Sequence, residues 1–226
     1  MGRLLSVLVC MLLLLPGASA AEAPKYLALT FEDVPPGCVE ELLEGLAQRE
    51  SRATFLYSAQ HLKESPAMAQ RILSGGHELG LRAFFAGELS QLSRRDMAGE
   101  LAMTRALLPE NAHPRFLRLG KNAAPQPVCQ VARATGLALL GWAGDFRNRA
   151  ARDSSAAGQS SVSRIRDGDV IAIDADSGAE VNAALNTVDI LRRQGFRLVT
   201  VSELARFRNR RVTAGEYYSR FPLKEP

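Results

Sequence analysis

Apolar residues along this chain follow two alternating patterns: short continuous runs, and longer stretches in which about every third or fourth residue is apolar. The short runs predict buried β-strands at residues 26–31, 53–57, 78–81, 115–118, 137–142, 170–173 and 197–201. The stretches with helical spacing lie between them and predict helices at 39–49, 65–74, 94–108, 125–135 and 180–194. Regular alternation of strand and helix predicts an α/β fold with a parallel sheet, open or closed into a barrel.

The first 20 residues have a different character. Arg3 precedes an apolar run at residues 4–15, and the small residues Ala18, Ser19 and Ala20 follow a Pro-Gly break. This order is typical of a secretory signal peptide that is cleaved after Ala20. The apolar run is also shorter than the ~20 residues that a membrane span needs, so we expect no stable membrane anchor.

The chain then divides into three parts: a signal peptide at 1–20, a catalytic-type domain at 21–205 and a basic tail at 206–226. We expect a secreted or periplasmic protein. The formal net charge of +4 is a mild excess and does not imply a nucleic-acid partner. The basic run Arg206–Arg211 is typical of a solvated surface, with contact to acidic envelope polymers as the alternative.

Two cysteines remain in the mature part, Cys38 and Cys129. Export would permit a disulfide between them, but bridging requires close Cα atoms, so paired and free thiols both stay open.

Charged residues follow several of the predicted strands. Because parallel α/β folds bind ligands at the C-terminal ends of their strands, we expect a shared site there, formed by Glu32-Asp33, Arg82–Ala86, Arg118–Asn122, Asp145 and Asp174–Asp176. A polar stretch at 146–163 predicts a loop beside this end of the sheet. Four aromatic residues are expected near the cleft: Phe84, Phe85, Trp142 and Phe146. Core packing is the alternative for Trp142 and Phe84.

Six segments, in this order, resemble the polysaccharide deacetylase family, also called the NodB homology domain or carbohydrate esterase family 4. They are LTFEDVP (29–35), ATFLYSAQHLKESPAMAQRILSGGHELG (53–80), FLRLGKN (116–122), LGWAGDFRNR (140–149), VIAIDADSG (170–178) and GFRLVTVSEL (195–204). The resemblance implies a distorted (β/α)7 barrel of the glycoside hydrolase/deacetylase type. It also implies a relation to hydrolases that remove acetyl groups from N-acetylglucosamine-type polymers.

The family uses zinc or another divalent metal, held by one Asp and two His, with a second Asp as base and a late His as acid. The resemblance places the base at Glu32 and the metal-binding Asp at Asp33. The two metal-binding His positions are Arg82 and Ala86, and the acid position is Asp174. A guanidinium stays protonated and offers no lone pair, so Arg82 cannot bind a metal. The chain is therefore similar to a degenerate member, and we expect no metal cofactor.

The remaining roles follow the same resemblance, which implies that Arg118, Asp145 and Trp142 contact the substrate. Arg82 is predicted to form an ion pair with Asp33 or Glu32 in place of the metal. None of the three histidines is expected to reach the site. His77 and His113 precede strands, and His77 is expected to make a structural hydrogen bond.

The leading hypothesis is a secreted deacetylase-like protein without metal-dependent activity. It would bind an envelope or extracellular glycan in the inherited cleft, or act beside a protein partner in the envelope. One alternative is a glycosidase that uses Glu32, Asp33, Asp145 and Asp174 as its acid and base. The other is an N-deacetylase with an atypical metal site. The sequence leaves open whether the protein is an enzyme.

Overall fold

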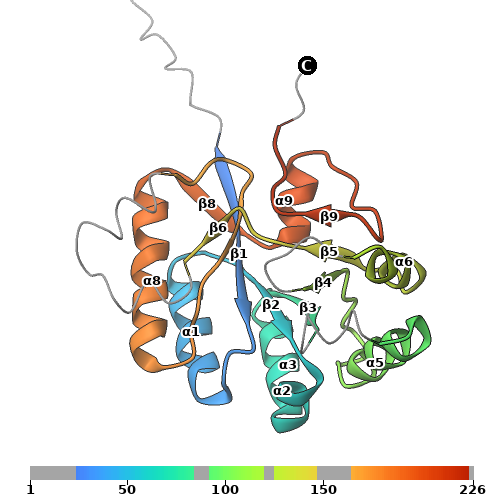
Figure 1. The fold of residues 1–226 in the computed structure, drawn as a ribbon. Helices are drawn as coiled ribbons and strands as arrows, with labels where there is room; N and C mark the ends of the chain where they lie inside the picture. The colour runs from blue at the N-terminus through green and yellow to red at the C-terminus, as the bar shows by residue number, and fades with distance from the viewer. Residues whose placement is uncertain (1–23, 84–91, 120–124, 147–163, 224–226) are drawn as a thin grey trace, which may run out of the picture.

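The structure is a computed structural model that describes residues 24–83, 92–119, 125–146 and 164–223 (Figure 1). Several predictions fall outside this part of the chain. They concern the signal peptide at 1–20, the aromatic residues Phe84 and Phe85, the family position Ala86 and most of the polar stretch at 146–163.

Parallel strands form one curved sheet, and all described helices except the last lie around its outer face (Figure 1). The strands are β1 (Lys25–Glu32), β2 (Thr54–Tyr57), β3 (Glu78–Arg82), β4 (Phe116–Arg118), β5 (Ala138–Leu140), β6 (Gly144–Asp145), β7 (Val170–Ala172), β8 (Phe196–Val199) and β9 (Tyr217–Tyr218). In the described part of the chain their order is β6-β7-β1-β2-β3-β4-β5-β9, and β8 pairs with β1 next to β7.

The helices connect the strands as the sequence pattern predicts. They are α1 (Pro36–Gln48), α2 (Ala59–Glu64), α3 (Pro66–Ser74), α5 (Arg94–Ala106), α6 (Gln126–Ala134), α8 (Gly178–Arg193) and α9 (Val201–Phe207). The seven predicted strands are confirmed to within a few residues, and the α/β barrel class is confirmed with them. The pattern misses α2, β6, α9 and β9. The last predicted strand ends earlier than expected, because Thr200 begins α9 with a capping box.

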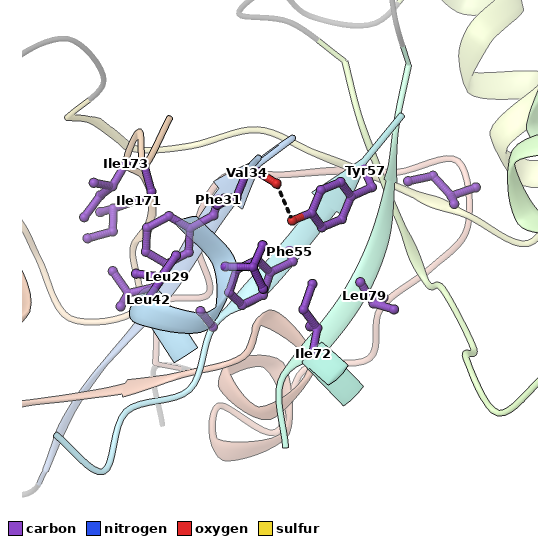
Figure 2. Packing of buried hydrophobic residues seen from close by; sticks show 14 of the residues in the cluster. Leu29, Phe31, Val34, Leu42, Phe55, Tyr57, Ile72, Leu79, Ile171 and Ile173 are labelled. Atoms are coloured by element: carbon purple, nitrogen blue, oxygen red, sulfur yellow. Dashed lines mark hydrogen bonds between the residues drawn. The ribbon is translucent and has the colours of Figure 1, made fainter. Parts of the chain in front are cut away.

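Side chains alternate between the two faces of the sheet, as they must in extended strands. On β1, Leu27, Leu29 and Phe31 point outward and pack with the helices, including Leu42 of α1 (Figure 2). Tyr57 lies in the same layer, and its hydroxyl donates to the Val34 carbonyl at 3.0 Å. Burial of these apolar side chains drives the association of helices with the sheet.

The inner face of the sheet is layered along the barrel. Its apolar layer contains Ala28, Leu56 and Phe116, together with Val201 and Leu204 of α9. Below this layer, towards the N-terminal ends of the strands, the Glu78 carboxylate accepts hydrogen bonds from Thr54 Oγ1 at 2.7 Å and from the Ser202 amide at 3.1 Å. Helix α9 therefore occupies the end of the barrel formed by the N-terminal ends of the strands, and the opposite end is left for the site.

The C-terminal segment spans the gap between β5 and β7. Strand β9 pairs with β5, and Arg220 forms an antiparallel bridge with Asp169, just before β7. The Phe221 amide donates to the Gly168 carbonyl, and Gly168 has φ +86°, where a Cβ would lie 2.3 Å from Phe221 O. Only glycine fits such an approach without strain. Residues 206–226 are predicted as a tail, whereas α9 runs across position 206 and the segment 217–221 joins the sheet.

Cys38 and Cys129 are not joined by a disulfide, so the pairing that the sequence left open is not formed. Among the described residues, no helix has the length and apolar character needed to cross a membrane.

Candidate functional site

The two adjacent acids lie where β1 ends and the chain turns into α1. Glu32 is the last residue of β1, and Asp33 adopts a left-handed conformation with φ 44°. Asp tolerates this region better than most residues do. The Asp33 amide donates to the Leu56 carbonyl at 3.1 Å, and its Oδ1 accepts from the Ser58 amide at 2.8 Å. These bonds to the end of β2 fix the Asp33 carboxylate at the mouth of the barrel.

Arg82 joins the two acids. Its Nε lies 3.0 Å from Glu32 Oε2, and its Nη1 contacts Asp33 Oδ2. The side chains are 32% exposed for Arg82, 12% for Glu32 and 9% for Asp33. The predicted ion pair is thereby confirmed, and it includes both carboxylates. The carboxylates of Glu32 and Asp33 are neighbours and are partly shielded from water. The positive charge of Arg82 offsets the repulsion between them.

Arg118 forms the floor of the site and is itself 1% exposed. It is in register with Arg82 on the neighbouring strand, and its Nη1 lies 3.3 Å from Glu32 Oε1. Its Nη2 donates to Thr30 Oγ1 at 2.7 Å, and that hydroxyl donates to the Ile171 carbonyl at 2.8 Å. The two oxygens of Glu32 therefore face two different arginines. The guanidinium carbon of Arg118 also lies 5.0 Å from the centre of the Trp142 ring, within cation–π range.

The expectation that none of the three histidines would reach the site is wrong. His61 Nδ1 lies 3.4 Å from Asp33 Oδ1 and 3.2 Å from Ser58 Oγ. Helix α2 begins directly after β2, so its first turn stands at the same edge of the sheet as the acids. The spacing of Ser58 and His61, three residues apart just past a strand, was the available signal. His77 does make the structural hydrogen bond that was predicted, accepting from the Ala53 amide at 3.2 Å.

The remaining predicted site residues are described by the structure to different extents. Asp174 follows β7 and is half-buried, and Trp142 is half-buried as well. Asp145 lies in β6, but its side chain is outside the described part, and Ala86 is outside it altogether. Phe146, which was expected near the cleft, is instead buried in the outer core.

Asp176 was missed as an individual site residue. Partial burial raises the pKa of its carboxyl to about 6, and negative charge on Asp174, Glu180 and Asp33 adds to the rise, while His61 opposes it. The negative charges on these residues are thus close enough to affect one another. The run of acids after β7 was the sequence signal for this acidic side of the site.

The described residues do not fit the metal that the family resemblance implies. No group of three His, Cys, Asp or Glu side chains among them is arranged to hold an ion. More directly, the Arg82 guanidinium contacts Asp33, the one retained family ligand. A fixed positive charge at this distance repels a divalent cation and contributes no donor atom.

The carboxylates and arginines lie at the C-terminal ends of the strands, where parallel α/β barrels place their ligand sites. The family model of polysaccharide deacetylases matches residues 19–140, more than half of the chain. The chain belongs to the polysaccharide deacetylase family.

Curated relatives agree with this assignment. A peptidoglycan-N-acetylglucosamine deacetylase of Bacillus cereus is 25% identical over 82% of this chain and 90% of its own length. A chitooligosaccharide deacetylase of Sinorhizobium fredii is 28% identical over 79% of this chain and 81% of its length. The peptidoglycan-N-acetylglucosamine deacetylase PgdA of Listeria monocytogenes is 25% identical, and the match covers 84% of this chain but only 41% of that protein.

Solved structures establish the (β/α)7 barrel fold. A deacetylase solved with its substrate has a TM-score of 0.75 at 23% identity, covering 86% of this chain and 96% of that one. A family 4 pseudoenzyme, solved as a mutant with restored enzymatic activity, has a TM-score of 0.70 at 19% identity, covering 80% and 68%. Because both identities are below 25%, these structural matches show the fold and carry no conclusion about activity.

Proposed function

We propose that this chain is an exported deacetylase homologue that does not catalyse metal-dependent deacetylation and that binds a carbohydrate polymer in the inherited cleft. The observation that carries the proposal is the contact of the Arg82 guanidinium with both Glu32 and Asp33. In the family, metal polarises the amide carbonyl and activates water. Here the Arg82 guanidinium contacts Asp33, the retained metal-ligand carboxylate. Arg82 is part of the chain and cannot act as a Lewis acid.

The position of the family base supports the same conclusion. A general base needs a carboxylate that can reach the attacking water and accept its proton. Glu32 instead has Arg82 on one oxygen and Arg118 on the other. Each oxygen of Glu32 therefore already contacts a guanidinium group. The family acid is replaced as well, since Asp174 stands at its position.

Glycan binding is supported by what remains at the cleft. The ring of the half-buried Trp142 lies beside the guanidinium of Arg118, 5.0 Å from its carbon. Aromatic faces with nearby polar groups are a common way to bind small polar ligands. Relatives named as deacetylases of peptidoglycan and of chitooligosaccharides indicate which polymers to test first. The alternative ligand in this proposal is a protein partner in the envelope.

The decisive experiment combines elemental analysis with an assay on N-acetylglucosamine oligomers, using the purified mature protein. We expect neither stoichiometric zinc nor acetate release, and we expect binding of the oligomers that Trp142→Ala weakens. About one metal per chain that disappears in Asp33→Ala would overturn the proposal in favour of an atypical metal site. Cleavage of the oligomers into shorter ones, lost in Glu32→Gln, would overturn it in favour of a carboxylate-based glycosidase.

Export is a separate part of the proposal. The signal-peptide pattern predicts a mature chain that begins near Ala21. N-terminal sequencing of the exported protein checks this, and a mature form that still carries residues 1–20 would contradict it.

A further inference from the structure

An arginine-lined cavity lies at the opposite end of the barrel from the carboxylate site. It has a volume of about 500 Å³, and its lining includes Arg115, which precedes β4, and Arg206, Arg210 and Arg211 at the end of α9. Ser202 and Glu203, from the start of α9, complete the polar part of the wall. We propose that this cavity, hereafter the arginine groove, binds an acidic carbohydrate polymer through its phosphate or carboxylate groups.

The arginines of the groove are held in position by a buried residue, unlike a run of basic residues that is only exposed to solvent. Arg208, in the middle of the run, is buried, contacts Asp167 through Nη2 and lies 5.4 Å from the centre of the Tyr26 ring. Asn209 then turns the chain with φ 49°. This anchor holds the residues on either side, Arg206 and Arg210, at the wall of the cavity.

The Glu78 carboxylate interacts electrostatically with Arg115, but the other groove arginines have no ion-pair partner among the described carboxylates. Glu203 is the one acid in the wall, and its Oε1 pairs with Arg52 Nη2 at 2.7 Å while its Oε2 accepts from the Thr200 amide. None of the four groove arginines forms an ion pair with a carboxylate in the described part of the chain. Four like charges around one concavity attract an external anion and accelerate its association.

The chemistry of the lining narrows the ligand. Arginine presents a planar fork of donors that matches the oxygens of phosphate and carboxylate groups. Proteins that hold single-stranded nucleic acid add aromatic side chains on which the bases stack. The lining of this cavity contains no aromatic residue. An anionic polymer without bases, such as an acidic glycan, therefore fits the groove better than nucleic acid does.

The location gives the groove a role that does not depend on what the cleft binds. The carboxylate site lies at the C-terminal ends of the strands, and the arginine groove lies at their N-terminal ends, with the apolar layer of the barrel between them. Two polymer segments can therefore be held at once without competing. The groove would keep the protein on an acidic polymer while the cleft contacts a second chain.

The test uses the full mature chain and measures binding of polygalacturonate, a phosphorylated mannan, neutral dextran and single-stranded oligothymidylate at low salt. We expect at least one acidic glycan to bind and dextran not to bind. Preference for the mannan identifies phosphate as the ligand group, and preference for polygalacturonate identifies carboxylate. Tighter binding of oligothymidylate than of both acidic glycans would overturn the proposal, and so would no binding of either glycan.

The variant Arg206→Gln/Arg211→Gln should weaken binding about tenfold or more, as expected for the loss of two charge-assisted contacts. The matched control Arg94→Gln/Arg95→Gln removes the same charge from the first turn of α5, outside the groove, and should change affinity far less. Equal losses in the two variants would show that net charge alone is responsible and would overturn the site. If the first variant unfolds, Arg211→Glu, placed beyond the end of α9, gives the same comparison against Arg95→Glu.

Discussion

Among single residues, Arg82 is the one whose replacement tests the site most directly. Removing it leaves Asp33, which is 9% exposed, without its guanidinium partner. Loss of a partner costs ~1 kcal/mol or less for exposed pairs and ~3–5 kcal/mol for buried ones. Because Arg82 is partly exposed, we expect Arg82→Ala to lower the free energy of unfolding by about 2 kcal/mol. Urea denaturation measures this change.

The control for Arg82→Ala is Arg71→Ala. Arg71 pairs with Glu40 on the surface, where the side chains are 50% and 57% exposed. We expect that change to cost below ~1 kcal/mol. If the two variants lose the same stability, the contacts of Arg82 are no stronger than those of a surface pair.

His77 is a second residue with a measurable effect, in this case on pH dependence. Burial, and then the positive charge of Arg52, lower the pKa of His77 to about 4 from its usual 6.5. The unfolded chain therefore takes up this proton at a higher pH than the folded chain does. The contribution to stability is complete above about pH 6.5 and falls as the pH drops towards 4, by about 3 kcal/mol.

The measurement compares wild-type protein with His77→Gln across this pH range. The advantage of the wild-type protein should shrink steadily as the solution is made more acidic. His113→Gln, which replaces an exposed histidine, is the control. A constant difference between wild type and His77→Gln from pH 7 to pH 4 would contradict the prediction.

Among the elements, the C-terminal segment that joins β5 to β7 can be tested separately. Phe221 is 1% exposed, and its ring stacks on Tyr218 with centres 5.2 Å apart. We expect Phe221→Ala to lower the free energy of unfolding by about 3–5 kcal/mol, the cost of emptying a buried aromatic position. Leu223, two residues on, is 61% exposed, so Leu223→Ala should have almost no effect. Similar results for the two variants would mean that the segment does not support the barrel.

The elements also show what the sequence could predict. Strands such as β1 and β2 are continuous apolar runs, because both of their faces are buried, and helices such as α1 and α8 repeat their apolar residues with helical spacing. Strand β9 could not be found this way. It has two residues, one of them exposed, and its place depends on pairing with a strand far away in the chain. Local pattern carries no information on such pairing.

The residues of the site also divide into those that local sequence pattern predicts and those whose position depends on the fold. Glu32, Asp33 and Arg118 were predictable because each stands at the end of a strong strand signal. Arg82 was predicted as their partner because the family resemblance places it at a metal-ligand position beside Asp33. His61 was missed because its position depends on the short α2, for which no apolar period was recognised. The contact between Arg118 and Trp142 likewise depends on the curvature of the sheet, which brings the end of β4 beside the residues after β5.

At the scale of the whole molecule, the barrel separates two kinds of charge. At the C-terminal ends of the strands, carboxylates are balanced by Arg82 and Arg118. At the N-terminal ends lie arginines that form no ion pair with a described carboxylate. The apolar layer between them is continuous with α9. Replacements in one end should therefore leave the other end intact, because sites without shared partners act nearly independently.

This independence allows the family chemistry to be tested on the intact scaffold. Restoring imidazoles at the two lost ligand positions, with Arg82→His and Ala86→His, would place nitrogen donors where the family has them and remove the positive charge beside Asp33. We expect the double variant to gain zinc affinity, measured by competition with a chromogenic chelator. We expect only weak deacetylation, because Asp174 still stands at the position of the family acid.

The control for this gain is the same double variant with Asp33→Asn, which keeps both imidazoles but removes the carboxylate. Zinc binding that survives this change would come from the new histidines alone and would not be the family site. A folded double variant that binds no zinc would show that the strand ends no longer converge as they do in the active relatives. If zinc binds and the further change Asp174→His raises deacetylation, the ion pair of Arg82 and the replaced acid together account for the difference from the family chemistry.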